Sequence, residues 1–359
     1  MATSEDLLTV TTGEDVLGVP PEPVRGSVAL RTLQLLLPAV GAFGVICVAV
    51  LVLGADPLLV LGKMISGSLG SQYDVSEVLM VMAPLILCGL AAAVPFSARL
   101  WNIGGDGQLY VGAVAAVVVG LNVGKDVPGE LLAALCVLAG IAAGACWAIV
   151  AGLVKVLVAG NEVIVTLMLN LLAGLAADYV VTGPYAQGVS PQTKTIPSGA
   201  TFGSFWQTGF NQAIFIAIAV ALAVGVFMQR TRAGFGIRAS GENLDASRLA
   251  GFAVHRLWVG AFGLGGACAG LAGALLVVAV YGAVIPGMGE QYGYTGIAVA
   301  LVARLRPLLL IPSAALFAVI QVGGSGLSAN AGVSPAITYV IQGVIVISFL
   351  AFRVLRVRI

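Results

Sequence analysis

The sequence predicts an all-α membrane protein, a polytopic bundle of about ten transmembrane helices. Of its 359 residues, 59% are hydrophobic and only 9% are charged, whereas about a quarter of the residues in average soluble proteins are charged. Apolar stretches of about 20 residues, long enough to cross a bilayer, recur along the whole chain with helical rather than alternating periodicity. The net charge of +1 gives no reason to expect a nucleic acid partner.

The first 31 residues are predicted to form an N-terminal tail, of which residues 1–24 are expected to be disordered. Residues 1–24 carry five acidic residues and no Lys or Arg, and they end in a Pro-rich segment. A basic N-terminal region of the kind that begins a secretory signal is therefore missing from this stretch. We expect the tail to lie in the cytoplasm.

Residues 32–359 are predicted to form one transmembrane domain. Two polar segments interrupt it: residues 182–212, which are too long for a simple connection and so are expected to be structured or to serve as a docking surface, and residues 229–256. The expected spans are, in order, about 33–53, 75–96, a third that begins within 103–120, then 131–158, 163–181, 213–228, 257–281, 292–302, 308–322 and 335–352.

The distribution of basic residues predicts the orientation of these spans. Loops on the cytoplasmic side carry an excess of Lys and Arg. With a cytoplasmic N-terminus, 14 of the 17 Lys and Arg residues fall on the inner side, and only Lys63, Lys125 and Lys194 fall outside. Both termini and residues 229–256 are then cytoplasmic, and residues 182–212 are periplasmic.

A short helix is predicted within the cytoplasmic segment 229–256, which carries five arginines and the single histidine, His255. Asn243 is a suitable N-cap and Gly251 a suitable stop. A helix this short is not stable alone in water. We therefore expect neighbouring helix ends or a partner protein to hold it; the alternative is an ordinary basic loop.

A weak internal repeat suggests a pseudo-two-fold arrangement. Gly105-Asp106, followed by Tyr110, Gly112 and Ala116, recurs 184 positions later as Gly289-Glu290, followed by Tyr294, Gly296 and Ala300. The two copies would start from opposite sides of the membrane, as in an inverted repeat. Interfaces between such repeats are where transporters place their solute sites.

Three groups of polar residues could line a path through the membrane. The first is Asn102, Asp106 and Gln108, in a segment whose glycines disfavour a continuous helix. Non-helical backbone at membrane depth survives only where it lines a cavity or is buried in protein. The alternative is a cytoplasmic turn with Asp106 in solvent.

The second group is Glu162, Thr166 and Asn170, whose four-residue spacing places them on one helix face. That face is expected to point into the bundle, where Thr166 and Asn170 serve most simply as interhelical hydrogen-bonding groups. For Glu162, capping or a salt bridge is as reasonable as contact with a solute.

The third group lies in residues 286–294, where Gly and Pro interrupt an apolar region. Glu290 and Gln291 could lie on the axis of a re-entrant element, with Tyr292 or Tyr294 stacking on a planar ligand. An outer loop with interfacial tyrosines is the alternative.

The sequence contains no arrangement typical of an enzyme or a metal site. All five cysteines lie in apolar stretches, and a single histidine offers no Cys/His spacing for a metal. No P-loop motif occurs, so the chain does not bind ATP in that way itself.

Several segments resemble the permeases of ATP-binding-cassette (ABC) importers of the branched-chain amino acid, ribose and nucleoside class. The segment TRAGFGIRASGENLDASRLAG, residues 231–251, resembles their cytoplasmic loop, and residues 84–113 resemble their Asn-Ile-Gly-x-(Glu/Asp)-Gly-Gln region, with Asp106 where Glu is commoner. GNEVIVTLMLNLLA from Gly160 and TGP from Thr182 are similar to the nucleoside and simple-sugar permeases. GYTGIAVALVARLRP from Gly293 also matches, with Ala303-Arg304 where a Gly is more usual.

The resemblance implies a permease subunit of the bacterial plasma membrane that lacks its own ATPase. Its expected partners are an ABC ATPase that binds ATP-Mg, a second, non-identical and smaller permease in the same bilayer, and an extracytoplasmic binding protein. The family's acids and amides map onto Asn102, Asp106, Gln108, Asn170 and Glu290. The loop is expected to contain a coupling helix seated in the ATPase, through Arg238, Gly241, Glu242, Asn243, Ala246, Ser247 and Gly251.

Nucleosides are the expected solute, by resemblance. One alternative keeps the importer and changes its solute to a ribose-like sugar or a branched-chain amino acid. The other is an ion-coupled transporter or channel working alone, in which Asp106 and Glu290 would titrate or bind Na⁺.

Overall fold

The computed structural model describes most of the chain between residues 56 and 348. The described residues are 41, 44–45, 47–48, 51, 56–124, 127–188, 190–203, 205, 210–289, 291–331 and 339–348. Glu290, most of the first predicted span and both ends of the tenth lie outside them.

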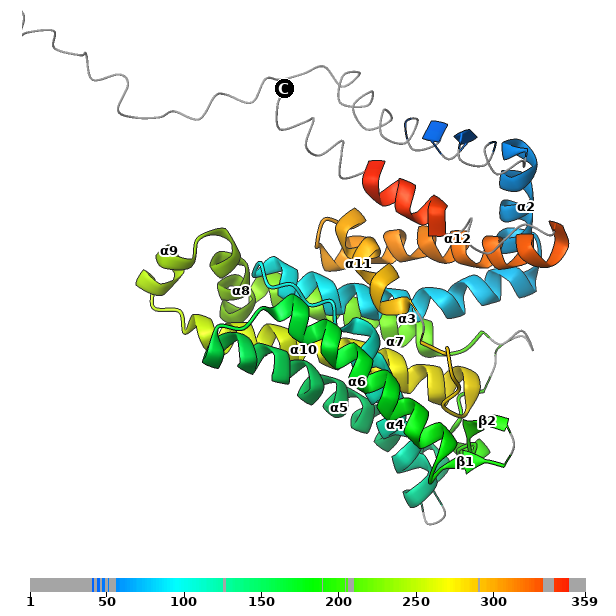
Figure 1. The fold of residues 1–359 in the computed structure, drawn as a ribbon, viewed down its shortest axis with the longest axis horizontal. Coiled ribbons are helices and arrows are strands. Elements are labelled where there is room, and N and C mark those ends of the chain that lie inside the picture. Colours follow the sequence, from blue (N-terminus) through cyan, green and yellow to red (C-terminus); the bar gives the residue numbers. More distant parts are fainter. Residues whose placement is uncertain are drawn as a thin grey trace, which may run out of the picture.

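Seven helices of the described part are long and apolar enough to cross a membrane, which confirms a polytopic all-α bundle. They run along the longest axis of the molecule (Figure 1). They are α3 (Gln72–Ser97), α4 (Gly105–Val123), α5 (Gly129–Val158), α6 (Glu162–Thr182), α7 (Ala213–Arg230), α10 (Val254–Leu275) continued by the π-helix η2 (Leu276–Tyr281), and the 3-10 turn η3 (Pro307–Leu309) continued by α12 (Leu310–Ala331).

The predicted spans differ from the structure at two places. The helix α11 (Tyr292–Val302) has only 11 residues and at 1.5 Å per residue covers about 16 Å, half of a bilayer core of about 30 Å. The segment 292–302 is therefore not a complete span. The helix α2 (Pro57–Leu69), with Asp56 as its N-cap, was not predicted and packs against α12.

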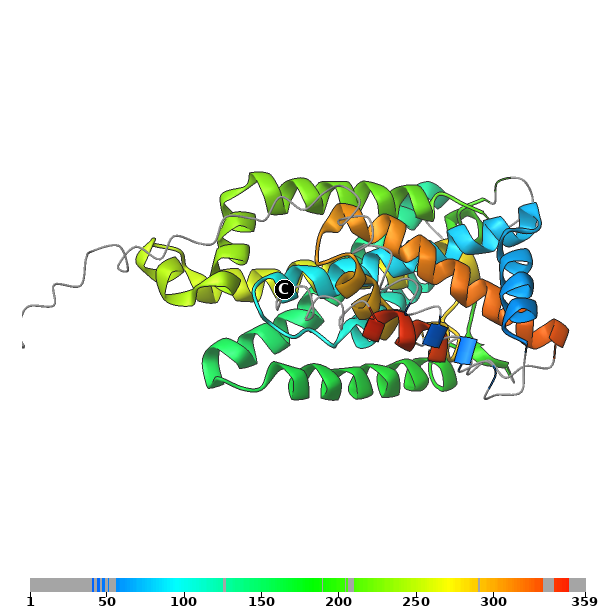
Figure 2. The same cartoon turned by 90° about the horizontal axis from the view of Figure 1, so that it is seen from above.

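The bundle is held together where three helices meet backbone to backbone. Glycines of α4, α5 and α10 face one another, and a Cβ on any of them would collide with main-chain atoms or an alanine Cβ of a neighbouring helix; they are Gly112, Gly140, Gly144, Gly266 and Gly270. Small residues at helix contacts permit this close approach in membranes, where packing rather than the hydrophobic effect drives association. Figure 2 places α7 along one edge of the bundle and α5 with α6 along the other.

The long loop before α7 is structured, as predicted. It contains the antiparallel strands β1 (Ala186–Gln187) and β2 (Ser190–Thr193) and the turn η1 (Ser198–Ala200). Backbone hydrogen bonds tie it to the end of α10–η2, from Ile196 N–H to Gly282 C=O at 2.8 Å and from Phe202 N–H to Val278 C=O at 2.9 Å.

The opposite end of the molecule from β1 and β2 carries two short polar helices, α8 (Arg232–Glu242) and α9 (Leu244–Leu249) (Figure 1). Arginines from three chain segments lie together at this end, around one groove. We call it the basic end. This clustering agrees with the predicted loops, which placed Arg99, Arg238, Arg304 and Arg306 on one side of the membrane.

Candidate functional site

The non-helical link between α3 and α4 is locked by amides. Asn102 is 1% exposed; its amide nitrogen donates to Ala91 C=O at 3.0 Å, and its oxygen accepts from the Gln108 amide at 2.9 Å and from Gly104 N–H at 3.1 Å. Buried polar groups must find such partners in an apolar environment. The link is thus buried in protein at Leu100, Asn102 and Gly104, as non-helical backbone at membrane depth must be unless it lines a cavity, whereas Arg99 and Trp101 are exposed.

Two polar residues of α6 hold the same link from the other side. Asn170 accepts from Gly107 N–H at 2.8 Å and donates to Ile103 C=O at 2.9 Å, and Thr166 accepts from Ile103 N–H at 3.4 Å. The predicted polar face of this helix does point into the bundle, because Glu162 and Thr166 are buried. Interhelical hydrogen bonding, the simpler of the two roles considered for Thr166 and Asn170, is what the geometry provides.

The carboxylate of Asp106 lies between the N-termini of two helices. It belongs to the first turn of α4, and its oxygen accepts from Gly293 N–H, in the first turn of α11, at 2.6 Å. A helix N-terminus carries partial positive charge, so one anion here stabilises two helices. Asp106 is only 8% exposed, which rules out the alternative of a solvated turn. The two copies of the internal repeat therefore meet at this carboxylate.

The remaining predicted path residues are less enclosed. Gln291, at a φ of 72°, immediately precedes α11 and is exposed, and Tyr294 is 47% exposed. The structure brings Asn102, Asp106, Gln108, Thr166 and Asn170 together, but it gives each a hydrogen-bonding role within the protein. Contact of any of these residues with a solute stays a prediction.

Glu162 forms a salt bridge. Its carboxylate lies 2.8 Å from the Lys155 ammonium at the turn between α5 and α6, and both side chains are largely shielded from solvent. This pair spans the turn that begins at Ala159, the C-cap of α5, whose φ is 49°. Of the roles considered for Glu162, a salt bridge is the one observed.

The polar segment at the basic end consists of two helices rather than one. The predicted helix is confirmed as α9: Asn243 is its N-cap, accepting from Ala246 N–H at 3.0 Å, and Gly251 follows it with a φ of 80°. The preceding helix α8 was missed. Its N-cap is Thr231, whose hydroxyl accepts from Gly234 N–H at 3.0 Å.

Close packing joins α8 to the bundle. A Cβ on Gly241 would collide with Ser97 C=O at the end of α3, and a Cβ on Gly234 would collide with the backbone of α7 at Phe227 and Met228. A short helix pair held in this way moves with the spans that it contacts. This explains how helices too short to be stable alone keep their shape.

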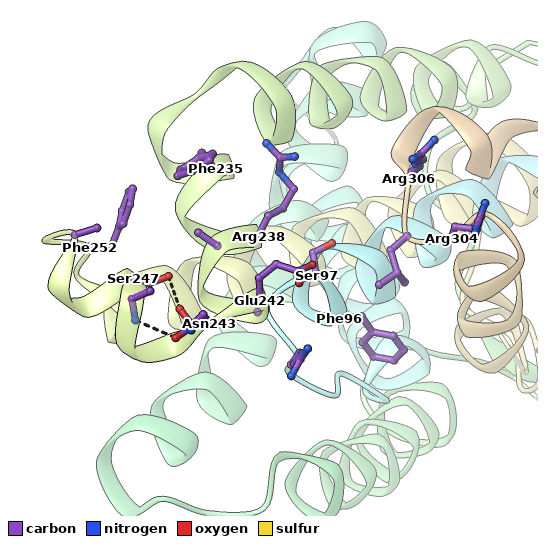
Figure 3. A pocket seen from close by; sticks show the side chains of 16 residues that line it. Phe96, Ser97, Phe235, Arg238, Glu242, Asn243, Ser247, Phe252, Arg304 and Arg306 are labelled. Atoms are coloured by element: carbon purple, nitrogen blue, oxygen red, sulfur yellow. Dashed lines mark hydrogen bonds between the residues drawn. The ribbon is translucent and has the colours of Figure 1, made fainter. Parts of the chain in front are cut away.

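A groove of about 1070 Å³ lies between these helices and the ends of the spans (Figure 3). Figure 3 shows Glu242 and Ser97 close together, with Arg238 on one side and Arg304 and Arg306 on the other. Four arginines and one acid give the groove a positive balance. Its lining residues are Phe96, Ser97, Arg99, Phe235, Arg238, Ala239, Gly241, Glu242, Asn243, Ala246, Ser247, Ala250, Phe252, Arg304, Leu305 and Arg306.

Sequence reasoning found part of this groove. Arg238, Gly241, Glu242, Asn243, Ala246 and Ser247 all line it, whereas Gly251 only ends α9. The contributions of residues 96–99 and 304–306 were missed, because they come from other loops far away in the chain. The excess of basic residues in all three loops was the available signal.

Comparisons with known proteins agree with these features. Residues 75–350 match the family described as branched-chain amino acid transport system / permease component. The chain is 32% identical to the glucose ABC transporter permease protein TsgB13 of Haloferax volcanii, over 87% of this chain and 85% of the relative. It is 30% identical to the nucleoside ABC transporter permease protein NupB of Lactococcus lactis subsp. cremoris (88% and 90%) and to the guanosine ABC transporter permease protein NupP of Bacillus subtilis (79% and 82%).

Proposed function

The chain belongs to the permease component family of branched-chain amino acid transport systems, and we propose that it moves nucleosides and is driven through the groove at its basic end. It is a multi-pass membrane permease of an ABC importer and is not itself catalytic. A stand-alone ion-coupled transporter or channel is therefore no longer an alternative.

The observation that carries the proposal is the groove between α8, α9 and the span ends. It is open, positively charged and lined by three separate chain segments, so a protein seated in it contacts several spans at once. An ABC ATPase with acidic residues on its docking surface fits this chemistry, since complementary charge steers association and fixes register. Because basic loops mark the cytoplasmic side, we place this end and both termini in the cytoplasm.

Packing contacts between α9, α8 and α3 provide a route by which motion of the ATPase would reach the interior. Movement of α9 carries α8, and α8 presses on the end of α3 through Gly241 and Ser97. The link that follows α3 is hydrogen-bonded to α6 through Asn170. Rigid helices joined in this way turn a push at one end into opening on alternate sides of the membrane.

A nucleoside is the solute that we favour. NupB and NupP, similar over about four fifths or more of both chains, carry nucleoside and guanosine in their names. Glucose is the second candidate because TsgB13, at 32% identity, is a glucose permease by name. A binding protein would deliver the solute to the structured loop 182–212, and a second, non-identical permease would complete the path.

Charge reversal tests the ATPase seat. Arg238→Glu places an acid in the groove, whereas Lys194→Glu makes the same charge change at an exposed position on the far end. We expect Arg238→Glu to lower the amount of ATPase that co-purifies with the tagged permease by about tenfold, since like charges across an interface cost on the order of 1–2 kcal/mol or more. Equal co-purification with both variants would contradict the proposed seat.

The solute is tested on the binding protein of the same importer. Melting curves with a panel of nucleosides, glucose, ribose and branched-chain amino acids report which ligand binds the folded state, because such a ligand raises the melting temperature. We expect a nucleoside to give the largest shift. A shift with glucose alone would replace the nucleoside by the second candidate and leave the ATPase seat standing.

A further inference from the structure

A second, smaller cavity lies in the other half of the bundle, away from the basic end. It has a volume of about 260 Å³ and is formed by α3, η2, the first residue of α11 and α12. We call it the polar chamber. Its lining residues are Glu77, Met80, Val81, Leu276, Val280, Tyr281, Tyr292, Gln321, Val322 and Ser325.

The polar chamber contains an amide oxygen and a carboxylate that are costly to place inside a membrane bundle. The Gln321 side-chain oxygen is buried and has no hydrogen-bond partner among the described residues. Glu77 takes part in neither of the two salt bridges that the described residues form. Acids and unsatisfied amides inside a bundle are costly and mark ligand or ion pathways.

The backbone beside the polar chamber is also unusual. Leu276, Val280 and Tyr281 belong to η2, a π-helix that interrupts the regular α10. Such segments are frequently found at functional sites. Here it brings the Tyr281 ring to the wall of the polar chamber, facing the same space as Tyr292.

A neighbouring cavity connects this region with the structured outer loop. It has a volume of about 480 Å³ and is lined by loop residues Thr195, Ser198 and Thr201 among others. Met80, Val280 and Tyr281 line both cavities. The two spaces therefore adjoin along one shared wall, and together they extend from the loop 195–202 into the bundle.

We propose that the polar chamber is a solute-binding site on the transport path, which receives a nucleoside that enters beneath the outer loop. Acceptors at Glu77 and Gln321 suit the ribose hydroxyls or base amino groups, and the tyrosine rings suit a flat base. The apolar floor of Met80, Val81 and Val322 completes a pocket near the lower end of the usual range of roughly 300–1,000 Å³, which fits one compact solute. The identity of the solute rests on the proposed function.

Transport by the assembled importer tests the polar chamber. The permease, its ATPase, its partner permease and its binding protein are reconstituted in liposomes, and uptake is measured with the solute that raises the melting temperature of the binding protein most. Gln321→Leu removes the unpaired acceptor, and Ser325→Trp fills the space without removing a buried acceptor. Gln72→Leu and Ser66→Trp make the same changes at exposed positions of α3 and α2.

We expect both chamber variants to lower uptake by about tenfold or more, Gln321→Leu because one well-placed hydrogen bond is lost and Ser325→Trp because its indole fills the space that the solute would occupy. ATP hydrolysis stimulated by the binding protein should stay within about twofold of wild type, because the basic end is untouched. Uptake at the wild-type rate in both chamber variants, or an equal loss in the matched controls, would overturn the proposal. If Gln321→Leu does not assemble, Ser325→Trp alone decides.

The result is separable from the identity of the solute. If glucose rather than a nucleoside shifts the binding protein, the same four variants are assayed with labelled glucose. Loss of glucose uptake in the chamber variants would then support the polar chamber as a solute site, with glucose in place of the nucleoside. Unchanged glucose uptake would overturn both the chamber as a solute site and the nucleoside as the solute.

Discussion

The carboxylate of Asp106 is expected to be a major stabilising group, and Asp106→Asn tests this. The asparagine keeps an oxygen that can accept from Gly293 N–H, now 2.6 Å from the carboxylate, but it removes the charge. Loss of charge assistance costs about 1–1.5 kcal/mol, and loss of the interaction with two helix N-termini costs on the order of 1–2 kcal/mol more in a buried geometry. Relief of desolvation offsets part of this, leaving about 2 kcal/mol.

Thermal unfolding of the purified permease in detergent measures the effect. About 2 kcal/mol corresponds to a fall in Tm of roughly 2–4 °C for a chain of 359 residues. Asp245→Asn is the matched control, because Asp245 is also the second residue of a helix, α9, but its side chain is 89% exposed. Equal shifts in Tm for the two variants would refute the bridging role of Asp106.

Three further predictions concern the backbone and the turns. Ala159→Gly relieves a left-handed φ of 49° at an exposed position and should raise the stability by about 1 kcal/mol, measured as an increase in Tm; a fall would contradict the strain. Gly270→Val should abolish the monodisperse peak in size-exclusion chromatography because its Cβ meets the backbone of α5, whereas Gly260→Val on the same helix has free space and should leave the peak unchanged. Lys155→Met leaves Glu162 without its partner at 2.8 Å and should cost about 1–3 kcal/mol, visible as a lower Tm that Lys155→Arg restores; equal Tm values for both variants would argue against the salt bridge.

The long spans could be predicted because each depends on local sequence. Hydrophobic stretches placed α3, α5, α6, α7 and α10–η2 to within three residues at either end. The Asn243 cap of α9 is also a local signal. The half-length of α11 was harder to predict. An apolar sequence indicates that a segment is buried, but it does not indicate that the helix begins beside Asp106 of another helix.

The helix α8 was missed for a different physical reason. It contains three glycines in 11 residues, each unfavourable in a helix by about 1 kcal/mol relative to Ala. Two of these glycines, Gly234 and Gly241, are what allow α8 to lie against α7 and α3. The glycines therefore disfavour α8 as an isolated helix but permit its close packing in the folded protein. No local sequence pattern reveals that packing.

The polar site residues could be selected from the sequence, but their partners could not. The spacing of Thr166 and Asn170 predicted an inward face, yet the groups that they bind lie 63 and 67 positions away. The partner of Asp106 is 187 positions away. Such pairings depend on topology, and they decide whether a polar residue holds the protein together or remains available to a ligand.

The availability of hydrogen-bonding groups distinguishes the link around Asn102 from the polar chamber around Gln321. Asn102 has its donor and acceptor occupied by the protein, so a solute would have to displace bonds that hold α3, α4 and α6 in place. Gln321 has an acceptor with no partner among the described residues, so a solute that donates to it gains a bond without breaking one. Release must follow binding in a transporter, and a site that the protein can leave empty without rearranging its helices meets that requirement. The polar chamber is therefore a better place for the moving solute than the hydrogen-bonded link around Asn102.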